Sequence, residues 1–107
     1  MQLQDNTLTK LKQFEYLFQH GHKSVLVNET LRKLAEIELF DLKKNLSEIE
    51  KKIGLFEKQY NMNSQVFSEK FDSGKLDDSA DFIEWFAYVD MRDELLKKIE
   101  ILDKTDA

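Results

Sequence analysis

Two histidines and a series of carboxylates are the side chains in this sequence whose types could do chemistry. His20 and His22 flank Gly21, and closely spaced imidazoles can hold a metal ion when further ligands are near. No third ligand stands at zinc spacing, and the chain has no cysteine. We therefore interpret the two imidazoles as side chains near the end of a helix, where the helix dipole favours cations. We expect no metal and no cofactor.

The carboxylates are concentrated in the second half of the chain. Residues 61–107 contain twelve Asp and Glu against six Lys and Arg, whereas residues 1–60 contain nine against ten. Three interpretations are open: a solvated acidic face, a patch that attracts a basic partner, or a metal site. The metal interpretation fails on spacing, because residues 72–83 lack the alternating oxygen ligands and central glycine of a calcium loop. No Glu-x-x-His pair exists for a di-iron bundle.

Enzymatic motifs are absent from the sequence. It contains no nucleophile elbow, glycine-rich phosphate loop, Cys–His pair or zincin motif, so we expect a protein that is not an enzyme. The formal net charge of −5 also disfavours duplex nucleic acid, whose phosphates attract clustered Lys and Arg. Direct nucleic-acid binding is therefore not expected.

A heptad pattern predicts the long helix around which the chain is organised. Between Ala35 and Tyr60, apolar residues recur at alternating steps of four and three: Ala35, Leu39, Leu42, Leu46, Ile49, Ile53, Phe56 and Tyr60. This spacing places them on one helix face, the seam, and charged residues of both signs lie between them. Another element must cover the seam. Gly54 interrupts the pattern and indicates either a close helix approach or a bend.

Three further helices are predicted around the long one. The first runs from Asn6 or Thr7 to His20 and ends at Gly21. The long helix then starts at Ser24 or Asn28.

After a break at residues 61–64, a short helix is predicted from about Ser64 to Ser73, closed by Gly74. The last helix, about Ser79 to Asp103 with Asp78 or Ser79 as its cap, turns one face inward. That face contains Phe82, Trp85 or Phe86, Val89, Leu96, Ile99 and Leu102.

These elements predict an all-α fold. The seam and the last helix have nearly equal lengths, which favours an antiparallel helical hairpin with a short corner helix and an N-terminal helix. We expect a single helical domain over residues 1–107, with an N-terminal helical arm at 1–23 and the hairpin at 24–103. One hairpin buries only a narrow strip, so we predict a homodimer that forms a four-helix bundle.

The segment 82–89 contains more apolar residues than one partner helix can cover, with seven in eight. Either the bundle encloses this segment, or it docks another protein, since Trp and Tyr are typical interface anchors. For the docking interpretation, the candidate residues are three aromatics with an acidic rim: Trp85, Phe86, Tyr88, Asp81, Glu84 and Asp90.

The stretch from Tyr60 through Trp85 also resembles a known pattern. It contains the string Tyr-Asn-Met-Asn-Ser, a following Phe, a Gly-Lys-Leu-Asp-Asp turn and a Phe-Ile-Glu-Trp helix start. The pattern is similar to that of small prokaryotic coiled-coil proteins that resemble the antitoxin half of two-protein toxin–antitoxin operons. Asn61 stands where those proteins usually have Gly, and Lys75 where they have Glu. The resemblance implies a helical protein that binds a toxin-like partner encoded nearby.

We therefore expect a non-enzymatic, antitoxin-like interaction module that binds a basic protein. The alternative is a structural or adaptor coiled coil that associates only with itself. No apolar run is long enough to span a bilayer and no signal-peptide pattern is visible, so a cytoplasmic protein is expected.

Overall fold

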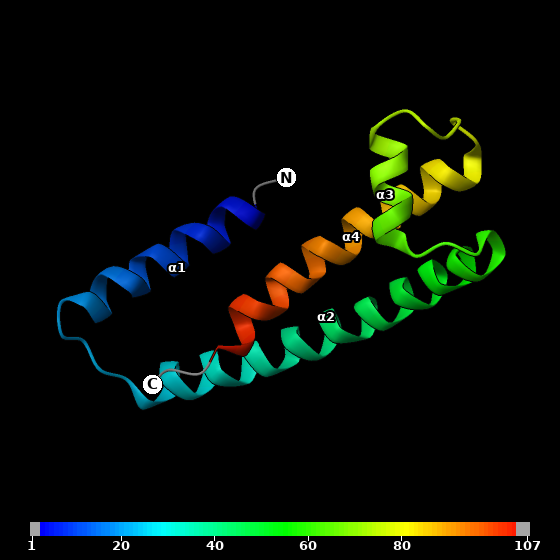
Figure 1. Ribbon diagram of the computed structural model, residues 1–107. Helices are drawn as coiled ribbons and strands as arrows, with labels where there is room; N and C mark the ends of the chain where they lie inside the picture. Colours follow the sequence, from blue (N-terminus) through cyan, green and yellow to red (C-terminus); the bar gives the residue numbers. More distant parts are fainter. Residues whose placement is uncertain (1–2, 105–107) are drawn as a thin grey trace. The chain divides into compact units, whose positions relative to one another are not determined.

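The computed structural model describes residues 3–104, with side chains for residues 6–104. Four helices account for most of this range: α1 (Leu3–Gln19), α2 (Val25–Tyr60), α3 (Ser64–Asp72) and α4 (Ala80–Asp103) (Figure 1). Residues 3–104 contain no strand, which confirms the all-α prediction. None of the helices in this range is both long and apolar enough to cross a membrane.

The chain divides into two compact units inside α2. Unit 1 is Met1–Lys33 and contains α1 with the first turns of α2. Unit 2 is Leu34–Ala107 and contains the rest of α2, α3 and α4. The predicted boundary at residues 23 and 24 coincides with the connection between α1 and α2, whereas the contacts of the chain place the first turns of α2 with α1.

Three helices end in the same way, with a left-handed residue just past the last turn. Gly21 has φ 93°, Asn61 φ 50° and Gly74 φ 76°. In each case the next amide donates back across the turn, from His22 to the Leu17 carbonyl at 3.0 Å for example. This is the Schellman arrangement, which satisfies carbonyls that the helix leaves unpaired. The predicted stops at Gly21 and Gly74 are confirmed.

The helix starts follow side-chain caps, with one correction to the predictions. α1 begins at Leu3, so Asn6 and Thr7 lie inside the helix and neither caps it. α2 is capped by Ser24, whose Oγ accepts from the Val27 amide at 3.1 Å. Ser79 caps α4, with its side chain accepting from the Phe82 amide. Two candidate caps were predicted for each of α2 and α4, and in both helices the serine is the residue that caps.

In unit 2, α4 packs antiparallel against α2, and α3 covers the corner between them (Figure 1). Among residues 6–104 the buried apolar side chains are few, and they come from all three helices: Ile49, Ile53, Phe67, Trp85 and Val89. The seam prediction is confirmed, because Ile49 and Ile53 are buried and Leu42 and Leu46 are half-buried.

The inward face of α4 differs from the prediction near its end. Leu96 and Leu102 are 44% and 36% exposed, whereas Leu95 packs against the core. Leu95 lies seven residues after Tyr88, so the two share a helix face that reaches the core. Sequence spacing alone did not distinguish Leu95 from its neighbour Leu96.

Gly54 does not mark a close approach between helices. A Cβ built at this position meets no atom within 4 Å. Replacing Gly54 by alanine should therefore stabilise the protein by about 0.5–1 kcal/mol, because glycine loses more backbone freedom than alanine when a helix forms. Urea unfolding followed by circular dichroism measures the change.

The matched control is Gly74→Ala, since a Cβ there also meets no atom within 4 Å but the backbone has φ 76°. This variant should lose about 1–2 kcal/mol, the cost of a left-handed conformation for a residue with a Cβ. A Gly54→Ala variant that unfolds at lower urea than the parent would show that the position needs glycine.

Candidate functional site

Trp85 lies at the centre of an aromatic corner built by three helices. The aromatic corner comprises Phe56 and Tyr60 of α2, Phe67 and Phe71 of α3, and Phe82, Trp85, Phe86 and Tyr88 of α4. The ring of Phe67 stacks on the indole at 3.9 Å between centroids with an angle of 2°. Phe56 stacks at 5.7 Å with an angle of 13°. Trp85 and Phe67 have no exposed surface, so they lie at the centre of the core.

A chain of hydrogen bonds connects the same three helices through polar atoms. The indole Nε1 of Trp85 donates to Oγ of Ser64 at 2.9 Å. The hydroxyl of Ser64 donates in turn to Oε2 of Glu57 at 2.8 Å, and the Ser64 amide donates to the same oxygen at 2.8 Å. A buried indole N–H without an acceptor would be costly, and Ser64 supplies that acceptor from the first residue of α3.

Tyr60 and Asp81 form a second link between α2 and α4. The phenol of Tyr60 donates to Oδ2 of Asp81, which also accepts from Nε2 of Gln59 at 3.3 Å. The bond to the Asp81 carboxylate raises the pKa of Tyr60, and partial burial and the negative charges of Asp81 and Asp77 raise it further. All of these effects favour the protonated phenol.

The structure separates the six residues predicted to bind a partner. Trp85 is fully buried with its N–H satisfied by Ser64, so it belongs to the core and a partner cannot reach it. Phe86, Tyr88 and Asp81 are half-buried, whereas Glu84 and Asp90 are exposed.

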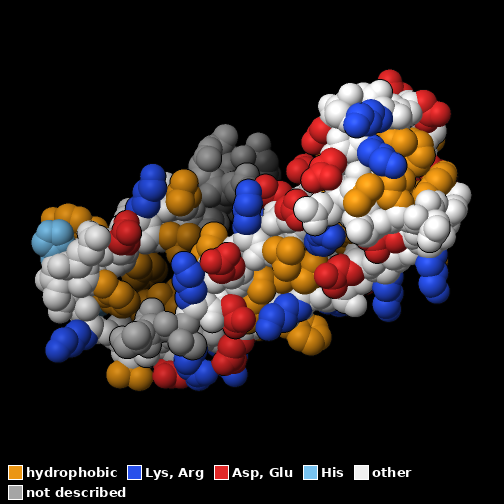
Figure 2. All heavy atoms as spheres, in the orientation of Figure 1, with side chains coloured by type: hydrophobic (Ala, Val, Ile, Leu, Met, Phe, Trp, Pro, Cys, Tyr) orange, Lys and Arg blue, Asp and Glu red, His pale blue; other side chains and the backbone are white. Residues whose placement is uncertain are grey.

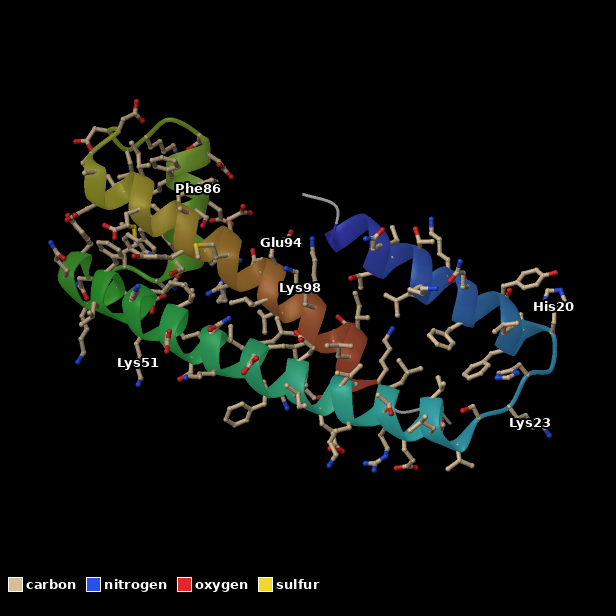
Figure 3. The ribbon with its side chains drawn as sticks, turned by 180° about the vertical axis from the view of Figure 1, so that it is seen from behind. His20, Lys23, Lys51, Phe86, Glu94 and Lys98 are labelled. Atoms are coloured by element: carbon tan, nitrogen blue, oxygen red, sulfur yellow. The ribbon has the colours of Figure 1, made fainter. Side chains whose placement is uncertain are left out.

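The half-buried members of this group also have partners within unit 2. Phe86 lies on the side of α4 next to α3 and packs on Phe71 with ring centroids 5.0 Å apart (Figure 3). The phenol of Tyr88 donates to Glu84 at 2.9 Å, and Nζ of Lys52 lies 5.3 Å from its ring centre. Reachable surface at this site therefore comes mainly from the acidic residues.

Sequence reasoning missed Glu57 and Ser64 as the polar partners of the tryptophan. Ser64 was predicted to lie between the break after the long helix and the short helix, and it is the first residue of α3. The signal for these polar partners was the single tryptophan itself. Its N–H needs an acceptor nearby when the indole is buried in a three-helix corner. Which residue supplies it depends on the angle between α3 and α4.

Acidic side chains surround the corner on its outer surface. Asp77, Asp78, Glu84 and Asp90 are all exposed, and red side chains rim the region of α3 and the start of α4 in Figure 2. Blue side chains are fewer there, in agreement with the excess of Asp and Glu in this half of the sequence. Within the described part of the chain, no group of three or more His, Asp and Glu side chains is placed to hold a metal ion.

Comparison of the chain with protein-family models, with curated proteins and with solved structures yields no match. What this corner does must therefore be argued from its own side chains.

Removing the Ser64 hydroxyl should destabilise the protein. In Ser64→Ala the buried indole N–H loses its acceptor and Glu57 loses a donor, which should cost about 1–3 kcal/mol. The matched control is Ser68→Ala on the same helix, because its buried Oγ has no hydrogen-bond partner among the residues that the structure describes. Chemical denaturation compares the two, and equal losses would contradict a special role for Ser64.

Alkaline pH should weaken the link between Tyr60 and Asp81. The phenol contributes its full stabilisation below its ordinary pKa of 10.0, and this contribution is lost as the pH rises through the raised pKa of the folded state. The difference in unfolding free energy between the parent and Tyr60→Phe should therefore be constant below about pH 10 and shrink above it. A difference that stays constant through the alkaline range would contradict the bond to Asp81.

Proposed function

We propose that this chain is a non-enzymatic, antitoxin-like interaction module that binds a basic protein through the outer face of α4. The binding surface, called the acidic surface below, consists of Ile83, Glu84, Ala87, Asp90, Met91 and Glu94. It retains Glu84 and Asp90 from the sequence-based candidates. Trp85 does not belong to this surface. It packs in the core and fixes the position of α4, which carries the surface.

One observation carries the proposal, namely exposed apolar side chains within an acidic rim. Ile83 and Met91 are 53% and 47% exposed. They lie eight residues apart, which separates them by about two turns along α4 and by about 80° around its axis. The carboxylates of Glu84, Asp90 and Glu94 are exposed around them. An apolar centre with a charged rim is the usual composition of a protein-binding surface.

The charge of unit 2 favours a basic partner. Residues 34–107 contain eleven Lys and Arg against eighteen Asp and Glu, a formal charge of −7. A surface of this sign accelerates the encounter with a basic protein and repels acidic ones. The packed aromatic corner behind α4 supports the same function, since a surface held in place by packing loses less entropy on binding.

Charge reversal on the acidic surface should weaken binding. The protein is co-expressed with the product of the adjacent gene, and the purified complex is measured by calorimetry at two salt concentrations. The double variant Glu84→Lys, Asp90→Lys should raise the Kd about 10- to 100-fold, because each change replaces an attraction by a repulsion.

The matched control is the double variant Glu100→Lys, Asp103→Lys, which reverses two exposed carboxylates on the same helix, the first of them about three turns after Asp90. It should leave the Kd within about 3-fold of the parent, since charges outside an interface contribute little to the binding free energy. If the adjacent gene product does not bind, or binds the double variant and the parent alike, the proposal is wrong.

A further inference from the structure

The acidic surface of α4 continues into a groove between α4 and α2. The groove has a volume of about 410 Å³ and is lined by side chains of both helices. Asp90, Met91 and Glu94 of the acidic surface line it from α4, and Glu48 lines it from α2. All of these residues belong to unit 2. The volume is at the lower end of the roughly 300–1,000 Å³ of small-ligand sites, so it suits one long side chain better than a whole helix.

The deepest part of this groove is apolar. Ile49 is buried and Leu95 is half-buried against the core, so these two residues form the floor. Met91 is 47% exposed and lies nearer the mouth. An aliphatic chain placed on this floor removes apolar surface from water, which is favourable. The groove therefore favours an occupant with a long aliphatic part.

Carboxylates stand around the apolar floor. Glu48, Asp90 and Glu94 line the groove and are exposed. Within the described residues Glu48 and Asp90 have no hydrogen bond or ion pair, and Glu94 has a long contact of 3.8 Å with Nζ of the exposed Lys97. Lys98 also lines the groove, so three carboxylates against one ammonium give it a formal charge of −2. This charge attracts an occupant with a positive head.

We infer that the groove takes an arginine side chain of the basic partner, which rests on the proposed function and names a contact made at its acidic surface. The methylene groups of the arginine lie on Ile49 and Leu95. The guanidinium lies at the mouth, where the carboxylates of Glu48 and Asp90 accept its N–H groups. The contact thus combines burial of apolar surface with charge-assisted hydrogen bonds.

The chemistry of the groove selects arginine over lysine. A guanidinium is more weakly hydrated than an ammonium, so it loses less when it leaves water for a partly apolar site. Its five N–H groups in a planar fork serve carboxylates of two helices at once, whereas an ammonium is a compact point charge. Arginine is also enriched in protein interfaces, where lysine is depleted.

Two variants of α2 test the inference in the complex with the product of the adjacent gene. Glu48→Gln removes a carboxylate of the groove and should raise the Kd measured by calorimetry at least about 5-fold. The matched control is Glu50→Gln, which removes the same charge from the same helix at an exposed position that does not line the groove. Both variants weaken long-range attraction equally, so the control should stay within about 2-fold of the parent.

The same measurements separate this inference from the proposed function. If charge reversal at Glu84 and Asp90 weakens binding while Glu48→Gln and Glu50→Gln behave alike, the arginine site is wrong and the acidic surface stands. If the adjacent gene product does not bind, the proposed function is wrong. The preference of the groove for arginine is then decided by a small probe.

The probe is Nα-acetyl-arginine amide, titrated into the isotope-labelled full chain and followed by NMR. The amides of residues 45–49 and 90–98 should shift and saturate. Nα-acetyl-citrulline amide has nearly the same shape without the charge and should bind at least about 10-fold more weakly. Nα-acetyl-lysine amide should bind at least about 3-fold more weakly. Lys98→Gln should tighten arginine binding about 2- to 5-fold, because it removes a like charge from the lining.

Three results of the titration overturn the inference. The first is no shift at residues 45–49 and 90–98, and the second is a set of shifts spread evenly over the carboxylates of unit 2. The third is a response to citrulline or lysine that equals or exceeds the response to arginine.

Discussion

The indole N–H of Trp85 has one acceptor, the hydroxyl of Ser64, and the arrangement of unit 2 depends on this bond. An unpaired N–H on a fully buried tryptophan would cost about 1–3 kcal/mol, and the first residue of α3 supplies the acceptor that avoids this cost. Glu57 then orients Ser64 through two bonds to one carboxylate oxygen. Phe67 of α3 and Phe56 of α2 stack on the same indole. Three helices are thus held together by one aromatic side chain and its polar partners.

The backbone turn after α2 makes this geometry possible. Asn61 takes a left-handed conformation, and the Met62 amide returns to the carbonyl of Glu57. The same residue, Glu57, therefore closes the end of α2 with its carbonyl and caps the start of α3 with its side chain. Asn63 adds a cap of its own by accepting from the Val66 amide. Few residues are needed to reverse the chain because the amides of Met62, Ser64 and Val66 all find acceptors in or next to the turn.

Periodicity was sufficient to predict the helices and the way the two long ones pack, since the seam from Ala35 to Tyr60 leaves one face to cover. Serines and glycines at the expected places located most of the ends, at Ser24, Ser79 and Gly74 for example. Spacing could not decide whether Trp85 was core or surface, because seven apolar residues in eight leave the inward side of the helix ambiguous. In the structure Phe56 and Phe67 stack on Trp85, and Ser64, 21 residues earlier in the chain, accepts its N–H. Contacts of this kind depend on the angle between helices, which a linear pattern does not encode.

The shortness of α3 has a consequence for how unit 2 opens. A helix of nine residues has no stability of its own in water, so its hydrogen bonds persist only while Phe67 remains between α2 and α4. The amide protons of α3 can then exchange with solvent only when the whole corner separates. They report the free energy of that cooperative opening, whereas amides at the far end of α4 exchange by local fraying.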